Sequence, residues 1–422
     1  MNLFREHRAA SVAFILITLF IDSLGFGLVI PILPKLVEQL VGGEISEASF
    51  AVGLLTSLYA VMQFFAAPLL GALSDRFGRR PVILLALTSL GVDYVLLSLA
   101  PNLWWLVAGR IIAGIGGATI TPAGAYIADV SPPDQRASNF GLMGVAFGLG
   151  FIAGPALGGV LGDGNLRLPF VVAAGLSLLN VLFGLVVLPE SLAPENRRPL
   201  VLAQTNPLGA LQAVWRNPGV AALMSVAAAT GVAQMGLKSV WVLYTTYRYA
   251  WSVTDVGISL AVIGLLSIVV QGALVRPAVA RFGEARTLVS GLLVTSASFG
   301  VFGLATQRWM MYLATAGYCL GVGLLGPAMQ GLLSRAVPAD EQGLLQGAVA
   351  SVNTPAAIVG PLLATGLFGY FVAPTAPVAL PGAPFFTGGV LCLVSLALAA
   401  RVAGARTVSR RVALAPMDAA VA

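Results

Sequence analysis

The chain has 422 residues, of which 58% are hydrophobic and only 9% are charged, with a formal net charge of +6. Soluble domains usually carry about 25% charged residues, so this composition excludes a water-soluble protein and indicates a lipid bilayer as the main solvent. No basic cluster is interleaved with aromatic residues, which excludes nucleic acid as a partner. The single histidine, His7, and the two cysteines, Cys319 and Cys392, offer no metal site, no disulfide framework and no cofactor ligands.

Long apolar stretches recur along the whole chain, and a bilayer core of about 30 Å needs roughly 20 such residues per helix. Asp22 interrupts the first span and no small-residue cleavage pattern follows, so this span is not a cleavable signal peptide. About twelve spans are predicted, which gives an all-α transmembrane fold. Three spans, the first, third and fourth, each contain one charged residue: Asp22, Asp93 and Arg110. The other spans are charge-free stretches between two charged residues, namely Glu47 and Asp75, Arg136 and Asp163, Arg167 and Glu190, Arg216 and Lys238, Asp255 and Arg276, Arg286 and Arg308, and Arg308 and Arg335. The stretch between Glu341 and Arg401 is long enough for two spans.

The distribution of basic residues predicts the orientation of the spans. If both termini are cytoplasmic, most arginines fall in inner segments, and the outer segments keep only Lys35, Arg167, Arg248 and Arg308. Cytoplasmic loops carry an excess of Lys and Arg, so we expect a multi-pass membrane protein with both termini in the cytoplasm.

The chain also repeats itself at a shift of about 205 residues. This shift places Arg76-Phe77-Gly78 over Arg281-Phe282-Gly283, and Pro122 over Pro327. This self-similarity predicts two six-helix pseudo-repeats. In transporters built from such repeats, the substrate site lies between the two halves near the bilayer midplane, and rocking of one half against the other gives alternating access. The predicted organisation is an N-terminal bundle at 1–188, a cytoplasmic linker at 189–217, a C-terminal bundle at 218–405 and a tail at 406–422.

A charged loop joins the second and third spans. Its glycines permit a tight turn, and its charges can latch a gate in one state and release it in the other. The alternative is that the arginines only fix topology. In the second half Ala280 replaces the acid, so the latch would be asymmetric. The candidate latch residues are Gly71, Asp75, Arg76, Gly78, Arg79 and Arg80, with Asp129 as the acid that Arg79 or Arg80 faces.

The fifth span combines small residues at helical spacing with a proline, which allows close backbone contact and a bend. These residues are Gly150, Gly154, Pro155, Gly158 and Gly159. The alternative is that these residues serve only ordinary small-residue helix packing. The glycines at 321, 323 and 326 match a dinucleotide fingerprint by letter, but they lie in an apolar span after no strand, so nucleotide binding is not predicted.

Charged residues inside spans indicate function, because burying a charge there costs at least about 2.5 kcal/mol. Asp22 and Asp93 lie at a similar depth, and Arg110 can hold such an acid ionised until a proton or a substrate displaces it. Alternatively, one acid simply pairs with Arg110 to fix packing. Amides at span depth can hydrogen-bond a substrate or a neighbouring helix; they are Gln63, Gln234, Gln271, Gln330 and Asn353.

These motifs carry a family resemblance. The loop at 71–80 resembles the signature loop of major facilitator transporters, and the span-five motif resembles the one associated with antiporters. With the segments 22–34, 59–64, 91–94, 110–119 and 124–129, the chain resembles the tetracycline/proton antiporter group of Gram-negative bacteria. The resemblance implies a protein of the bacterial cytoplasmic membrane that exports drug-like molecules in exchange for protons, with Asp22 in proton coupling and Asp93 and Arg110 in the polar pathway. We expect the protein to function as a monomer.

Three positions depart from that group. The family's acid in the ninth span is Thr295 here, and its histidine in the eighth span is Ser267. Lys238 stands where the family has a small apolar residue. It either snorkels to the outer face or faces the cavity, where it would compensate an acid or attract an anionic substrate group. Tyr94 is a candidate to flank a planar ligand. The cargo therefore stays open between tetracycline-like and other drugs.

Two other functions compete with export. A symporter or facilitator for a sugar-like metabolite would share the architecture, but the span-five motif favours antiport. A non-transporting sensor would also fit the scaffold, although no appended soluble domain supports it. An enzyme is not expected, because the spans contain no histidine to activate a nucleophile.

Overall fold

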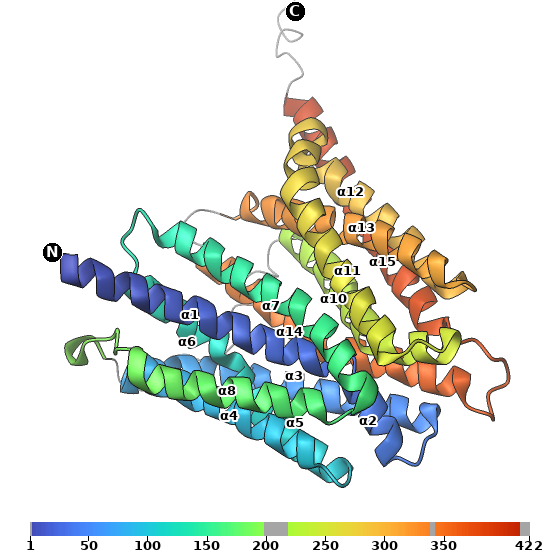
Figure 1. The fold of residues 1–422 in the computed structure, drawn as a ribbon. Coiled ribbons are helices and arrows are strands. Elements are labelled where there is room, and N and C mark those ends of the chain that lie inside the picture. Colours follow the sequence, from blue (N-terminus) through green and yellow to red (C-terminus); the bar gives the residue numbers. More distant parts are fainter. Residues whose placement is uncertain (1, 198–217, 338–341, 414–422) are drawn as a thin grey trace, which may run out of the picture. The chain divides into compact units, whose positions relative to one another are not determined.

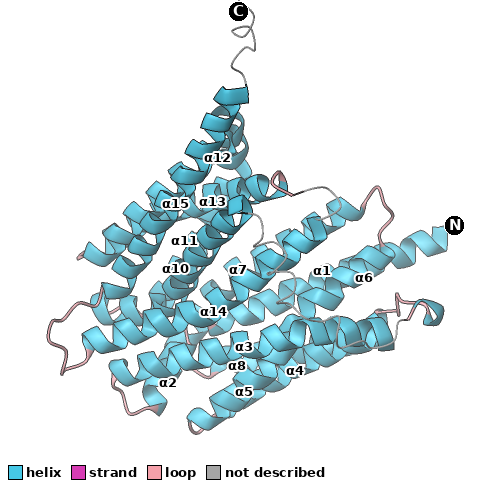
Figure 2. Cartoon of the chain, turned by 180° about the vertical axis from the view of Figure 1, so that it is seen from behind, coloured by secondary structure: helices cyan, strands magenta, loops and turns pink. Residues whose placement is uncertain are grey.

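The computed structural model describes residues 2–197, 218–337 and 342–413, and these residues form helices joined by loops, with no strand among them (Figure 2). Most of the predicted linker and the end of the predicted tail lie outside the described residues. The predicted all-α transmembrane class is confirmed.

The first half of the chain forms the helices that carry the first six spans. They are α1 (Asn2–Val29), α2 (Leu33–Leu40), α3 (Ile45–Phe77), α4 (Arg79–Leu99), α5 (Leu103–Gly116), the 3-10 turn η1 (Gly117–Thr119), α6 (Ile120–Val130), α7 (Arg136–Gly164) and α8 (Leu168–Val187). The fourth span is α5, η1 and α6 together, and α2 is too short to cross a bilayer.

The short turn η2 (Pro194–Asn196) precedes the second half. Its helices are α10 (Pro218–Tyr249), α11 (Val253–Val269), the π-helix η4 (Val270–Leu274), α12 (Val275–Leu304), α13 (Arg308–Ser334), α14 (Gln342–Val372) and α15 (Ala383–Ala413).

Eleven apolar helical stretches in the described residues are long enough to cross a membrane, and one of them, Val253–Leu304, has 52 residues. Its backbone leaves the helical conformation at Gly283, where φ is 76°. This stretch is therefore two spans, and the twelve predicted spans are confirmed. Gly78 occupies the matching place between α3 and α4, with φ of 104°. Only glycine adopts this backbone readily, so the repeat is visible in the turns as well as in the sequence.

The chain folds into two compact units. The first comprises Met1–Asn206, Gly236–Leu265 and Ala357–Pro384, and the second comprises Pro207–Met235, Leu266–Ala356 and Phe385–Ala422. The first unit thus contains parts of α10, α11 and α14 in addition to the first-half helices. The predicted division of domains at the linker stays a prediction.

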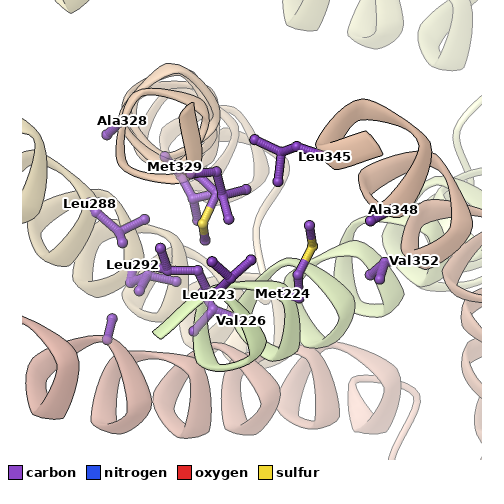
Figure 3. Close-up of a cluster of buried hydrophobic side chains, with 14 residues drawn as sticks. Leu223, Met224, Val226, Leu288, Leu292, Ala328, Met329, Leu345, Ala348 and Val352 are labelled. Atoms are coloured by element: carbon purple, nitrogen blue, oxygen red, sulfur yellow. The ribbon is translucent and has the colours of Figure 1, made fainter. Parts of the chain in front are cut away.

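Each unit has its own buried core. In the first unit α1 runs alongside α7 (Figure 1), and α4 packs against α8. In the second unit apolar side chains from α10, α12, α13 and α14 converge (Figure 3), among them Met224, Leu292 and Met329, each at most 6% exposed.

Candidate functional site

The first unit contains a cavity of about 230 Å³ that Asp22 lines. Helices α1, α3, α4, α5 and α7 contribute its walls. The Oδ1 atom of Asp22 is buried and has no hydrogen-bond partner among the described residues. A buried carboxyl group without a fixed partner is free to exchange a proton or to accept a bond from a ligand. The role of Asp22 in proton coupling stays a prediction.

Asp93 and Arg110 meet in the same cavity. Nη2 of Arg110, on α5, donates to Oδ2 of Asp93, on α4, at 2.7 Å. Asp93 is fully buried and Arg110 is 6% exposed, and the Arg110 guanidinium lies 5.9 Å from the ring centre of Tyr59. Oδ1 of Asp93 and Nε of Arg110 keep no partner within the described part of the chain. The pair therefore neutralises itself and still has bonding capacity for a polar ligand.

An aromatic wall faces this polar cluster. Phe26, on α1, and Phe147, on α7, both line the cavity and are 40% and 39% exposed. Phe151 stacks on each of them with ring centres 6.4 and 6.5 Å away. Exposed rings beside a cavity offer a surface for a planar molecule. The sequence analysis missed Phe26 and Phe147, because aromatic residues in a span are ordinarily core or lipid-facing.

Two other predicted cavity residues lie here. Nε2 of Gln63 donates to the carbonyl oxygen of Gly117 at 3.0 Å, so this amide bonds a neighbouring helix while it lines the cavity. Tyr94 also lines the cavity and is 4% exposed.

The second unit has a separate cavity of about 250 Å³ between the η4 region and α13. Gln271, in the π-helix, lines it together with Ser267 and Cys319. π-helical turns recur at functional sites in helical proteins. Of the described residues that line this cavity, none carries a charge at neutral pH.

Thr295 lines neither cavity. It is 1% exposed, and its hydroxyl donates to the carbonyl oxygen of Gly291 in its own helix at 2.7 Å. It packs against Gly321 of α13, where even a β-carbon would collide with the threonine. Gln330, on α13, and Asn353, on α14, have exposed side chains outside both cavities.

Lys238 and Gln234 lie one helical turn apart on α10. Neither lines the cavity around Asp22. The side chain of Lys238 is exposed and that of Gln234 is partly exposed.

The latch residues form a charge cluster at the α3–α4 turn. Arg79 pairs with Asp75 one turn earlier, and its Nε lies 3.2 Å from Oδ2 of Asp129 on α6. Arg80 donates to the carbonyl oxygen of Leu185 at 2.6 Å. Arg76 instead lies over the ring of Phe77, and Gly71 approaches Thr121.

Glu190 completes this cluster, and the sequence analysis missed it. Its Oε1 accepts from the backbone N–H of Arg79 at 2.8 Å, which places a carboxylate at the N-terminus of α4. This interaction satisfies free N–H groups and the positive end of the helix dipole. The signal in the sequence was a lone acid directly after the sixth span, which does not reveal its partner.

The glycines of span five make backbone contacts. Gly150, Gly154 and Gly158 of α7 touch the backbone of α1 at Phe20, Leu24 and Leu28. Gly159 touches Val253 and Gly257 of α11, and the carbonyl oxygen of Pro155 faces Gly257. The motif therefore lets one helix approach two others more closely than any side chain would allow.

Sequence comparison decides the family. The model of the Major Facilitator Superfamily matches residues 15–278 and 227–417. The chain belongs to the Major Facilitator Superfamily. Tetracycline resistance protein, class C, of Escherichia coli is 40% identical over 399 residues, which cover 94% of this chain and 98% of that protein. Tetracycline resistance protein, class G, of Vibrio anguillarum is 37% identical, and the alignment covers 90% of this chain and 95% of that protein.

Solved structures of this superfamily have the same fold. The human organic anion transporter MFSD10 (TETRAN) is 26% identical with a TM-score of 0.67, covering 93% of this chain and 99% of that chain. A bacterial homolog of the human lysosomal transporter Spinster has a TM-score of 0.75 at 16% identity, and the match covers 94% of this chain and 97% of that chain. This Major Facilitator protein is thus a multi-pass membrane transporter of small molecules, not an enzyme.

Proposed function

We propose that this transporter exports planar amphipathic drugs of the tetracycline type in exchange for protons, by alternating access in the bacterial cytoplasmic membrane. The observation that carries the proposal is the Oδ1 atom of Asp22, which has no hydrogen-bond partner among the described residues and shares a cavity with the Asp93–Arg110 pair and with two exposed rings. The carboxyl group of Asp22 exchanges the proton, the ion pair bonds polar substituents, and the rings of Phe26 and Phe147 hold the planar body.

The similarity to tetracycline resistance proteins over nearly the whole chain supports this choice of cargo. The charge cluster around Arg79 and the close contacts of the span-five glycines supply a latch and a tight helix contact that alternating access uses. We further propose that both termini are cytoplasmic, that the sequence halves at 1–188 and 218–405 are the two rocking bundles, and that one copy of the chain suffices.

A specific observation favours a second candidate substrate class. MFSD10, at 26% identity, is described as an organic anion transporter, and this chain has a lysine within α10. Export of organic anions is therefore the alternative to tetracycline-like drugs.

Everted membrane vesicles with an internal pH dye test the proposal. After a proton gradient is imposed, tetracycline should release protons in vesicles with the wild-type protein. Asp22→Asn should abolish this response while the purified variant still binds tetracycline. If Asp22→Asn exchanged protons normally, the coupling role of Asp22 would be wrong, and if sugars but not drugs released protons, the symporter would replace the exporter.

A further inference from the structure

Lys238 is a cation far from either end of its helix. It is the only charged residue of α10 before Arg248, and the helix continues eleven residues beyond it to Tyr249. At about 1.5 Å per residue, the outer end of α10 lies roughly 16 Å away along the helix axis. The flexible stem of a lysine side chain spans only part of this distance.

The surroundings of Lys238 on α10 are not those of a lipid-facing residue. Trp241, Val242 and Thr245, which follow it on the same face, are each at most 2% exposed. A lipid face looks different: Ile258 and Leu265, two turns apart on α11, are 48% and 59% exposed. Lys238 thus keeps an exposed side chain on a face whose neighbours are covered by protein.

Among the described residues, no carboxylate compensates this charge. Lys238 makes no ion pair and no hydrogen bond in the part of the chain that the structure describes. Asp93 is already paired with Arg110 in the same unit. An unpaired ammonium inside a span is costly, so such residues ordinarily face a ligand or a pathway.

We propose that Lys238 binds an anionic group, a carboxylate or an enolate, of the transported molecule. The inference rests on the proposed function, since it names the chemistry of the exported substrate. The positive charge of Lys238 has no counter-charge among the described residues. An anionic substituent of the substrate supplies that counter-charge, whereas a cationic drug would not.

A pair of aromatic ligands of equal shape tests this assignment. Binding of 2-naphthoate and of its neutral amide, 2-naphthamide, is measured on the purified full-length protein in lipid nanodiscs by tryptophan fluorescence. The wild type should bind the carboxylate about tenfold more tightly than the amide. Lys238→Gln should reduce this ratio to about one, and Lys238→Arg should keep most of it. Lys35→Gln, at the other lysine of the chain, is the matched control and should leave the ratio unchanged.

Three results would overturn the assignment: equal binding of the two ligands by the wild type, no saturable naphthoate binding, or a preference that survives in Lys238→Gln. The wild-type ratio needs no variant, so misfolding of Lys238→Gln would not decide the question. The vesicle assay separates this inference from the proposed function. Proton release by tetracycline without any carboxylate preference refutes only the role of Lys238, and a carboxylate preference without proton release refutes only the coupled export.

Discussion

Glu284 and Arg335 form an ion pair, with Nη2 of Arg335 3.0 Å from Oε1 of Glu284, at the place in the repeat where Arg79 pairs with Asp129 in the first half. Each pair joins the residue directly after a positive-φ glycine, Gly78 or Gly283, to the C-terminal end of the next span. The charges are exchanged between the halves. The sequence analysis found only the loss of the acid at Ala280, so it predicted an asymmetric latch and missed this reversed pair.

The reversed pair gives the first prediction. Arg335→Glu places two carboxylates at one site, and we expect tetracycline export in vesicles to fall about tenfold. The double variant Glu284→Arg/Arg335→Glu restores opposite charges and should regain more than half of the wild-type rate. Because Arg335 is largely exposed, the effect on thermal stability should be small. A double variant no better than the single one would show that the charges act separately.

The Asp93–Arg110 pair gives the second prediction. Arg110→Leu leaves a fully buried carboxylate without its cation, which costs about 3–5 kcal/mol for a buried pair. We expect a clearly lower melting temperature in detergent, measured by tryptophan fluorescence. The double variant Asp93→Asn/Arg110→Leu should recover most of the loss, and equal melting temperatures for the single and double variants would contradict this account.

The close contact between α7 and α1 gives the third prediction. A β-carbon at Gly154 would lie 2.6 Å from the carbonyl oxygen of Leu24 and 2.7 Å from Cα of Gly27, both main-chain atoms that cannot rotate away. Gly154→Ala should therefore destabilise the protein by about 1–3 kcal/mol. Gly148→Ala, on the same helix with nothing within 4 Å, is the control and should leave the melting temperature unchanged or slightly raised.

The aromatic wall of Phe26 and Phe147 gives the fourth prediction. Removal of a stacking ring costs about 0.5–1.5 kcal/mol, so Phe147→Ala should raise the Kd of tetracycline about 2–13-fold. Phe147→Tyr should keep near-wild-type affinity. Phe65→Ala removes an even more exposed ring, on α3, that does not line the cavity, and should change the Kd little. An equal effect of both alanine variants would argue against stacking at Phe147.

The buried position of Thr295 gives the fifth prediction. Because its hydroxyl bonds only within its own helix, Thr295→Val should leave export within about twofold of wild type. Thr295→Asp buries an unpaired carboxyl group against Gly321 and should reduce the amount of folded protein, as judged by size-exclusion chromatography. Restored or improved tetracycline export in Thr295→Asp would show instead that this position reaches the substrate.

The sequence by itself determined the solvent, the number of spans and the family. Span length and the scarcity of charge depend only on the thickness and polarity of the bilayer, so they are readable without contacts. The turns at Gly78 and Gly283 were also predictable, because the two glycines recur at a fixed shift in the sequence and glycine tolerates positive φ.

The tertiary structure alone decided which side chains share a cavity. Three helices bring Asp22, Asp93 and Arg110 together, and the same packing adds Phe26 and Phe147 to the wall. It turns Thr295 toward Gly321 and away from both cavities, and it sets Glu190 on the N-terminus of α4. Helical periodicity gives each residue a direction around its own axis, but the rotation of one helix against its neighbours follows from packing contacts far apart in the chain. For that reason the charged residues of the spans were predictable one by one, and their partners were not.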